Sequence, residues 1–210
     1  LDLVITTHFH SDHVGGVPFV LNNIPIGIAL DNNRQNHRYK SYKDAIKINE
    51  IQQLPATKDL VFNFNKNISL KILYPFRSFA TRVQKNQNSH RNPNNNSVVC
   101  KLSYGNIDFL FTGDLEKEKE IELAKIYNNR LEAEVLKAGH HGSATSSSPR
   151  FLKFVNPIFS VISVGKKNKF RHPSKSVLTR LKNSNCKILR TDKHGAITFK
   201  TDGKKLYFST

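Results

Sequence analysis

The chain of 210 residues contains no methionine, and no apolar run in it is long enough to cross a membrane. A membrane-spanning helix needs about 20 consecutive apolar residues, and no signal-peptide pattern opens the sequence. We therefore expect the chain to be soluble as it stands. Its opening residues, Leu1 to Ile5, have the apolar character of a strand interior. Together with the lack of methionine, this opening predicts a fragment of a longer protein that is missing N-terminal strands.

Cysteine is also scarce. The two cysteines, Cys100 and Cys186, lie far apart, and each is part of an apolar, strand-like run. Isolated cysteines of this kind are typical of buried thiols, although a disulfide between them stays open. Two cysteines cannot form a disulfide framework, and their spacing does not match a zinc knuckle. The sequence therefore gives no sign of a small domain held together by cysteines.

Acidic residues are few: 16 Asp and Glu stand against 33 Lys and Arg, which gives a formal net charge of +17. The excess is concentrated in residues 150–210, where there are 15 basic residues and only two acidic ones, Asp192 and Asp202. A surplus of this size attracts anionic partners and speeds their capture. Nucleic acid and anionic membrane are the candidate partners, and a general bias towards lysine and asparagine is the alternative explanation.

Short strand-like runs are interspersed with helical patterns along the chain, and three of the expected strands end on clusters of His or Asp. This order predicts one α/β layered domain over residues 1–210, with its chemistry at strand ends. Residues 76–96 are polar and rich in Asn, and they predict a long mobile loop within that domain. The expected strands lie at residues 1–6, 24–30, 61–64, 68–74, 97–104, 107–112, 133–138, 158–164, 187–190, 196–201 and 205–208, and the expected helices at residues 14–21, 34–50, 116–127, 149–155 and 175–183.

The strongest local pattern is the run His8-Phe9-His10-Ser11-Asp12-His13, which follows the first apolar strand. In an extended segment, residues two apart point to the same side, so His8 and His10 can bind one ion together. Asp12 and His13 then turn towards a neighbouring ion as the chain enters the next helix. Imidazole and carboxylate ligands suit Zn²⁺ or Mn²⁺ and need no thiolate. The run therefore predicts a two-metal site.

This run, placed between an apolar strand and Gly15-Gly16, resembles the signature of the metallo-β-lactamase superfamily. Further motifs narrow the resemblance to the C-terminal hydrolase domain of ComEC-type competence proteins, the DNA-uptake channel. The resemblance covers nearly the whole chain, and the pairing of His-His-Gly-Ser with His-Pro is quite specific. The motifs are, in order, Asn94-Asn95-Asn96-Ser97-Val98-Val99, Phe109-Leu110-Phe111-Thr112-Gly113-Asp114, Leu136-Lys137-Ala138-Gly139-His140-His141-Gly142-Ser143, Ile162-Ser163-Val164-Gly165, His172-Pro173, Arg190-Thr191-Asp192 and Gly195-Ala196-Ile197-Thr198.

The resemblance implies a four-layer αββα sandwich that holds two divalent ions, Zn²⁺ or Mn²⁺, without an organic cofactor. It implies that Asp114 bridges the ions and that His172 is the last ligand. Adjacent residues at a strand end point in opposite directions, so we expect only one of His140 and His141 to enter the site directly. His140 is favoured as ligand or acid, and His141 as the residue that orients it. The predicted ligands are His8, His10, Asp12, His13, Asp114, His140 and His172.

One stretch departs from the superfamily pattern. A third histidine for the first ion usually precedes the strand that contains Val98, and here the stretch reads Asn92-Pro93-Asn94-Asn95-Asn96. Because a neutral amide is a poor ligand, the first metal position lacks one imidazole unless His90 or His140 fills it. The occupancy of the two positions therefore stays open at this point.

The implied activity is metal-dependent hydrolysis of phosphodiester bonds in DNA during natural transformation, on the strand that does not enter the cell. Metal ions lower the pKa of a bound water to about 7 and so supply hydroxide at neutral pH. Asp12 would orient or deprotonate that water, and His140 or His141 would protonate the leaving oxygen. The resemblance also implies a membrane channel domain as a partner, with this domain tethered on the extracytoplasmic side. Residues beside the predicted ligands are expected to hold the DNA phosphates: Lys137, Ser143, Lys166, Lys167, Lys169 and Arg171.

Two other functions stay open. An acyl hydrolase that acts on small lactones, thioesters or β-lactams would use the same ligands, although the basic C-terminal third argues against small neutral esters. A non-catalytic DNA-binding domain with a decayed site is the other alternative, because a third histidine and some N-terminal strands are missing. Metal analysis separates this last alternative from the two enzymes, and activity on DNA against a chromogenic lactam or ester separates the enzymes from each other.

Overall fold

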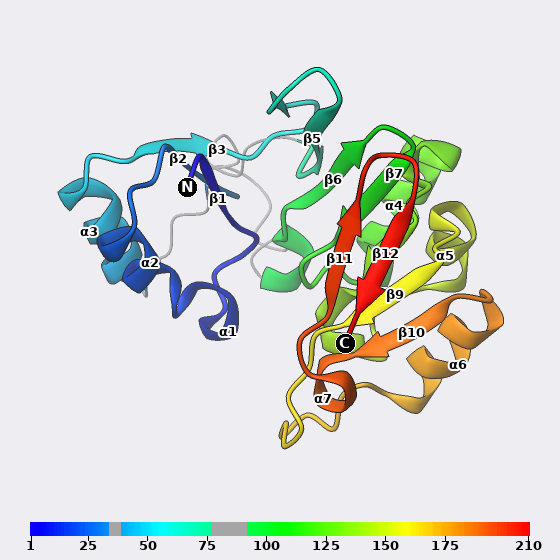
Figure 1. Cartoon of the computed structure of the whole chain (residues 1–210). Coiled ribbons are helices and arrows are strands. Elements are labelled where there is room, and N and C mark those ends of the chain that lie inside the picture. Colours follow the sequence, from blue (N-terminus) through cyan, green and yellow to red (C-terminus); the bar gives the residue numbers. More distant parts are fainter. Residues whose placement is uncertain (34–38, 77–91) are drawn as a thin grey trace. The chain divides into compact units, whose positions relative to one another are not determined.

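The structure is a computed structural model that describes residues 1–33, 39–76 and 92–210. The chain forms two compact units. Unit 1 comprises residues 1–60 and 72–98, and unit 2 comprises residues 61–71 and 99–210. Both units combine helices with β-sheet, which confirms the predicted α/β class (Figure 1). Within the described residues, no helix is both long and apolar enough to span a bilayer.

The sheet of unit 1 consists of three parallel strands in the order β1-β2-β3. Parallel neighbours need long crossover connections, and the helices of unit 1 are part of them. The middle strand β2 is the most buried of the three. The sequence does not predict β3, because its exposed glutamines interrupt any apolar alternation. The strands are β1 (Leu3–Thr6), β2 (Ile28–Asp31) and β3 (Gln52–Pro55).

One apolar core joins the helices of unit 1 to its sheet. Phe9 is central to it: its ring stacks on Tyr39 with centroids 5.5 Å apart and meets the ring of Tyr42 edge-on at 5.4 Å. Because the side chain of Phe9 is fixed in this core, the histidines on either side of it are turned to the other side of the chain. The helices are α1 (Ser11–Val14), α2 (Val17–Asn23) and α3 (Lys40–Ile48), and a 3-10 turn, η4 (Pro93–Asn96), also belongs to this unit.

The large sheet has seven strands in the order β10-β9-β8-β7-β6-β5-β4. Strands β7 to β10 run parallel to one another, whereas β6 is antiparallel to β7 and β4 is antiparallel to β5. Parallel strands have their carboxyl ends at one edge of the sheet, so the residues that follow β7, β8 and β9 are brought to the same edge. The strands are β4 (Val61–Asn63), β5 (Ile68–Tyr74), β6 (Val99–Tyr104), β7 (Ile107–Phe111), β8 (Val135–Lys137), β9 (Phe159–Ile162) and β10 (Lys187–Arg190).

Helices of unit 2 lie on one face of the large sheet, and the β11–β12 hairpin lies across the other face (Figure 1). Aromatic rings attach the hairpin: Phe199 meets Phe109 and Phe159 of the sheet, with centroids 5.9 Å and 5.5 Å apart. The remaining elements of unit 2 are α4 (Lys117–Tyr127), η5 (Asn128–Leu131), η6 (Gly139–Gly142), α5 (Pro149–Val155), α6 (Lys175–Asn183), α7 (Thr191–His194), β11 (Thr198–Thr201) and β12 (Leu206–Ser209).

Several expectations from the sequence can be compared with these elements. Cys100 and Cys186 are both buried and free, which confirms two buried thiols, and burial raises the pKa of Cys100 to about 12. The single helix expected at residues 14–21 is divided into α1 and α2. Residues 34–38 of the next expected helix, and residues 77–91 of the expected mobile loop, lie outside the described part of the chain.

Candidate functional site

Asp114 follows β7 in unit 2 and is 1% exposed. The chain reaches it through Gly113, whose φ of 53° lies in the left-handed region that favours glycine. The hydroxyl of Thr112 fixes the start of this turn by donating a hydrogen bond to the carbonyl of Lys137, 2.9 Å away. The Thr-Gly-Asp motif thus provides the turn that places a buried carboxylate at the edge of the sheet. Such a carboxylate requires nearby positive charge or hydrogen-bond donors.

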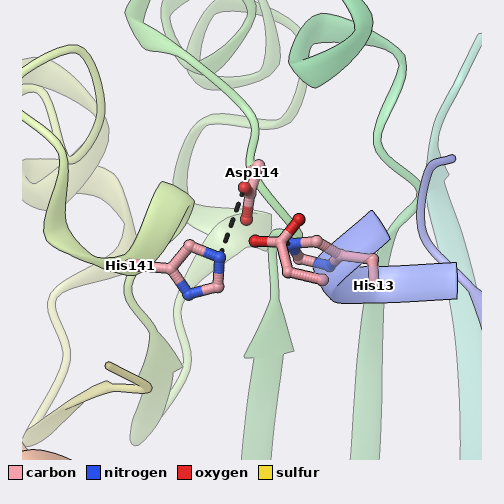
Figure 2. Close-up of side chains that lie close together, drawn as sticks. His13, Asp114 and His141 are labelled. Carbon is pink, nitrogen blue, oxygen red and sulfur yellow. Dashed lines mark ion pairs between the residues drawn. The ribbon is translucent and has the colours of Figure 1, made fainter. Parts of the chain in front are cut away.

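His140 and His141 supply two imidazoles to Asp114 from the turn η6, which follows β8. Their Nε2 atoms lie 3.8 Å and 3.5 Å from Asp114 Oδ2 (Figure 2 draws the His141 pair). Both residues have left-handed φ values, 48° and 52°, so the alternation of an extended strand does not apply to them. The premise that adjacent side chains must diverge here is therefore wrong, because it assumed extended backbone. Which of the two rings is a metal ligand stays a prediction.

The outer nitrogens of both rings are held by oxygen atoms. His141 Nδ1 lies 2.8 Å from the carbonyl oxygen of Ser163, and His140 Nδ1 lies 3.3 Å from Glu116 Oε1. A carbonyl only accepts hydrogen bonds, so His141 Nδ1 carries the proton and, in the neutral ring, Nε2 offers its lone pair towards Asp114. Metal-ligating histidines commonly donate their second nitrogen to a carbonyl or carboxylate in this way. Both rings meet this criterion.

A short chain of hydroxyls continues from Glu116. Thr145 donates to Glu116 Oε1 at 3.1 Å, and the hydroxyls of Ser143 and Thr145 are 3.0 Å apart. Ser143 is only 6% exposed. The structure therefore places the Ser143 hydroxyl in a buried network behind His140, and its predicted contact with a DNA phosphate stays a prediction.

The loop beyond these hydroxyls is clamped from two sides. Glu120 is fully buried, and its carboxylate accepts hydrogen bonds from the backbone N–H groups of Ser147 and Ser148 at 2.6 Å and 2.7 Å. Arg180 donates to the carbonyls of Ala144, Ser146 and Ser147 at distances between 2.8 Å and 2.9 Å. Burial raises the pKa of Glu120 to about 7, against the opposing effects of the two N–H donors and Arg180. This clamp fixes the loop that continues from η6.

His172 belongs to the segment between β9 and α6. Its backbone N–H donates to Asn168 Oδ1 at 2.7 Å, and its ring centroid lies 5.7 Å from that of His140. Burial, followed by the nearby rings of His140 and His141, lowers the pKa of His172. The N–H of Ser174 donates to the carbonyl of Gly142 at 2.9 Å, so this segment is attached to η6. Unit 2 thereby brings Asp114, His140, His141 and His172 to one edge of its sheet.

Unit 1 gathers the histidines of the first motif after β1. His8 is completely buried, and its Nε2 lies 3.1 Å from His10 Nδ1. Two nitrogen ligands with bonds of about 2.0–2.1 Å at a tetrahedral angle stand about 3.3 Å apart, so this spacing fits a shared ion. The rings of His8 and His13 are also close, with centroids 4.2 Å apart. Asp12 is exposed and lies 3.8 Å from His13 Nε2.

Two hydroxyls orient this cluster. Thr7 Oγ1 lies 3.2 Å from His8 Nδ1 and 3.3 Å from His13 Nδ1, and Ser97 Oγ lies 3.3 Å from His8 Nδ1. Ser97 directly follows the Asn-rich stretch of residues 92–96. It faces the nitrogen of His8 that is turned away from His10. The residue next to the Asn-rich stretch therefore contributes an orienting hydroxyl. His90, the other histidine considered for the first metal position, lies outside the described residues.

The basic residues predicted to hold phosphates fall into two classes. The ammonium of Lys137 donates to the carbonyl of Gly113 at 2.9 Å and lies 3.9 Å from Asp114 Oδ1, so it supports the Asp114 turn. The other four are exposed on the loop after β9: Lys166, Lys167, Lys169 and Arg171.

Sequence reasoning missed four residues of this arrangement: Thr7, Ser97, Glu116 and Glu120. Ser97 lies within a recognised motif and Glu116 lies two residues after one, and their position was the available signal. Glu120 gives no signal in the sequence, because an acidic residue in the first turn of a helix is normally a solvated one that complements the helix dipole.

The family model described as "Metallo-beta-lactamase superfamily" matches residues 1–166, most of the chain. The chain belongs to the metallo-β-lactamase superfamily. Two solved structures resemble it in fold. One is a protein described as a metal-dependent hydrolase from Parabacteroides distasonis, with 12% identity, a TM-score of 0.53, and coverage of 91% of this chain and 76% of the other. Another is CmlA, a diiron β-hydroxylase from Streptomyces venezuelae, with 11% identity, a TM-score of 0.55, and coverage of 90% and 43%. Together with the family match, these similarities confirm the metallo-β-lactamase fold.

Curated relatives narrow the position within the superfamily. The chain is 30% identical to ComE operon protein 3 of Bacillus subtilis over its whole length, which is 26% of that protein. It is 42% identical to competence protein ComA of Neisseria gonorrhoeae over 50% of this chain and 15% of that protein. It is 30% identical to recombination protein 2 of Haemophilus influenzae over 86% and 20%. The resemblance to competence proteins is therefore confirmed, and the chain spans about a quarter or less of each relative.

Proposed function

We propose that this metallo-β-lactamase chain is a metal-dependent phosphodiesterase that cleaves DNA as part of a DNA-uptake system. The observation that carries the proposal is the arrangement around Asp114, where a buried carboxylate is faced by two imidazoles whose outer nitrogens are already held. This arrangement fits the binding of a divalent cation. The names of the relatives, which are competence and recombination proteins, favour DNA as the substrate.

Because the chain belongs to the metallo-β-lactamase superfamily, we propose that it binds two divalent ions, Zn²⁺ or Mn²⁺. When bound, such ions supply hydroxide at neutral pH and stabilise negative charge on a phosphate. The sequence pattern alone favoured His140 as the ligand. The structure favours His141 instead, because the carbonyl of Ser163 fixes the proton of the His141 ring on Nδ1. The proposed ligands are His8, His10, Asp12, His13, Asp114, His141 and His172.

The remaining polar groups then have distinct roles. Asp12 is exposed and carries a carboxylate that can orient or deprotonate the attacking water. His140 is assigned as the proton donor to the leaving oxygen, and Glu116 Oε1, 3.3 Å from its Nδ1, holds the ring in position. Glu116 is in turn fixed by the hydroxyl of Thr145. Lys166, Lys167, Lys169 and Arg171 are proposed to neutralise neighbouring DNA phosphates.

We further propose that the chain works beside a membrane channel domain within a longer protein, on the extracytoplasmic side. The matched regions make up only 26% of ComE operon protein 3 and 15% of competence protein ComA. Protease accessibility of the full-length protein in intact cells, compared with lysed cells, tests this placement. Protection in intact cells would contradict it.

The enzymatic proposal is tested with chelator-treated protein that is reloaded with Zn²⁺ or Mn²⁺. The substrates are single-stranded and double-stranded DNA, a chromogenic lactam, a lactone and a thioester, and the Asp114→Asn variant is the control. We expect DNA cleavage that requires metal and is lost in the variant. Metal-dependent cleavage of the small acyl substrates without cleavage of DNA would replace the proposal by an acyl hydrolase. A protein that binds no metal and cleaves nothing would be a DNA-binding domain.

A further inference from the structure

Phe170 is an aromatic side chain that the fold keeps in solvent. It is 65% exposed, although a large apolar ring is normally buried because water disfavours its surface. It lies in the loop between β9 and α6, which projects beyond the end of β9 (Figure 1). The ring stacks on the imidazole of His172 with an interplanar angle of 20° and centroids 5.8 Å apart. An exposed ring is therefore fixed directly beside a proposed metal ligand.

The loop around Phe170 is braced by one side chain. Asn168 Nδ2 donates to the carbonyls of Gly165 and His172 at 3.0 Å and 2.9 Å, while its Oδ1 accepts from the N–H of His172 at 2.7 Å. Asn168 thus links both ends of the loop. Because the backbone of the loop is held in this way, Phe170 is presented in a defined position instead of covering neighbouring apolar surface.

The surroundings of the ring are strongly cationic. Lys169 Nζ lies 5.1 Å from the centroid of the Phe170 ring, and Lys166, Lys167 and Arg171 on the same loop are exposed. The sequence contains no acidic residue between Glu134 and Asp192. An exposed aromatic ring inside a purely basic segment is the combination that proteins use to bind single-stranded nucleic acid, with stacking for the bases and cations for the backbone.

We propose that Phe170, backed by His172, is a stacking platform for one unpaired base of the DNA substrate. This inference rests on the proposed function for the identity of the polymer. A base stacked on Phe170 places its own phosphates beside the lysines of the loop and beside His172. Bases inside a duplex are stacked on each other and offer only their edges, so the platform selects a single strand or a frayed end. The stacking carries no sequence preference, because every base has a π face.

Binding is measured by fluorescence anisotropy in the presence of EDTA, so that no cleavage occurs. The probes are a single-stranded oligonucleotide, the same oligonucleotide with abasic sites throughout, and its duplex. The variants are Phe170→Ala, which removes the ring, and Phe170→Trp, which keeps an aromatic face. Phe19→Ala is the matched control, because Phe19 is an exposed aromatic residue of α2, 73% exposed, outside the proposed site.

We expect Phe170→Ala to weaken binding of the single strand on the order of tenfold to a hundredfold, the range found for loss of one base–aromatic stack. The abasic strand should bind equally to the parent and Phe170→Ala, and Phe170→Trp should retain the parent affinity. Phe19→Ala should have no effect. An equal loss on the abasic strand would show that the ring only supports the loop, which would overturn the platform.

The alternative partner of an exposed aromatic ring among lysines is an anionic membrane. Co-sedimentation with phosphatidylserine–phosphatidylcholine vesicles tests this: vesicle binding that Phe170→Ala abolishes, with unchanged affinity for the single strand, would overturn the inference. The inference and the proposed function can fail separately. If the protein cleaves DNA with metal but Phe170→Ala binds DNA as the parent does, the proposed enzymatic function holds and the stacking platform is refuted. If Phe170→Ala selectively loses single-strand binding but the protein cleaves no DNA, the stacking platform holds and the proposed enzymatic function is refuted.

Discussion

The two groups of metal-type ligands in this chain are built in different ways. In unit 1 they lie within residues 8–13, as the chain leaves β1 and enters α1, and the hydroxyls of Thr7 and Ser97 orient them. In unit 2 they follow three separate strands and are oriented by a carboxylate, a carbonyl and an amide. The first group depends mainly on local chain direction, whereas the second exists only when the large sheet is folded. Substitutions in unit 2 should therefore have the larger consequences.

The largest effect is expected for Asp114→Ala. Removing the buried carboxylate takes away a proposed metal ligand and the partner of two imidazoles. We expect activity on DNA to fall on the order of a thousandfold, about 4 kcal/mol of transition-state stabilisation, and metal content to fall with it. Mass spectrometry of bound metal and the circular dichroism spectrum are the measurements. His10→Ala in unit 1 is the comparison and should lose less metal. If Asp114→Ala kept the full metal content and the rate of the parent, Asp114 would serve only to form the turn.

Glu120→Gln tests the clamp beneath the ligand turn of unit 2. Burial raises the pKa of Glu120 from 4.5 to about 7, so the folded state retains a proton that the unfolded state releases between these values. The contribution of Glu120 to the free energy of unfolding is therefore fully present below pH 4.5 and falls, by at most about 3 kcal/mol, as the pH rises through 7.

Urea unfolding of the parent and Glu120→Gln at pH 5 and pH 8 measures this difference. The parent should exceed the variant by more at pH 5 than at pH 8. Glu118→Gln is the control, because Glu118 is exposed on the same helix, and it should show no such pH dependence. If the parent exceeded the variant in stability by more at pH 8 than at pH 5, the two N–H donors and Arg180 would outweigh the effect of burial on the pKa of Glu120.

Glu116→Gln and Ser97→Ala compare the orienting groups of the two units directly. Loss of a partner that holds a metal-ligating histidine typically reduces metal affinity or activity by about 10–100-fold. We expect Glu116→Gln near the upper end, because it removes a charge beside His140, and Ser97→Ala near the lower end, because Thr7 still contacts His8. Titration of chelator-treated protein with Mn²⁺ and rate measurements on DNA check the order. The reverse order would show that the unit 1 cluster is the more sensitive of the two.

The smallest effect at physiological salt is expected for the combined variant Lys166→Ala, Lys167→Ala and Lys169→Ala. For each phosphate that is no longer neutralised, the slope of log K against log salt should become shallower by about 0.7–0.9, so the combined variant should flatten it by about 2 to 3. Metal content should stay unchanged. The matched control removes the exposed Lys40, Lys43 and Lys47 of α3 in unit 1. Equal slopes for the parent and the loop variant would show that these lysines do not neutralise DNA phosphates.

Much of the fold could be predicted from the sequence because its signals are local. Apolar runs predicted most strands, and the strand-end motifs pointed to Asp114, His140 and His172, which the structure brings close together. The strand β3 was missed because Gln52 and Gln53 are exposed at the edge of a sheet and show no alternation. The first expected helix is divided at Gly15, where a Cβ atom would stand 2.4 Å from the Ser11 carbonyl oxygen. Close packing requires glycine at this position, and helix propensities read from the sequence do not reveal such a requirement.

The sequence pointed to the residues that unit 2 brings together around Asp114, but it did not predict the orientation of their side chains. The positions of Asp114 and His172 after parallel strands follow from topology, which sequence patterns can suggest. The shared direction of His140 and His141 follows from two consecutive left-handed residues, and non-glycine residues adopt that conformation too rarely to be expected. The inward course of Lys137 could not be foreseen either, because it depends on the carbonyl of Gly113, contributed by a different strand end.

The contact between η6 and the segment that carries His172 has a mechanical consequence. A Cβ atom at Gly142 would stand 2.6 Å from Pro173 Cβ, and the carbonyl of Gly142 accepts the N–H of Ser174 at 2.9 Å. Two loops that leave different strands are therefore joined at this contact, and we expect a displacement of either to reach the other. The amide proton of Ser174 is a built-in reporter of this junction. Its rate of hydrogen exchange follows the opening of both loops at once, and a cation that holds His141 and His172 together would slow it.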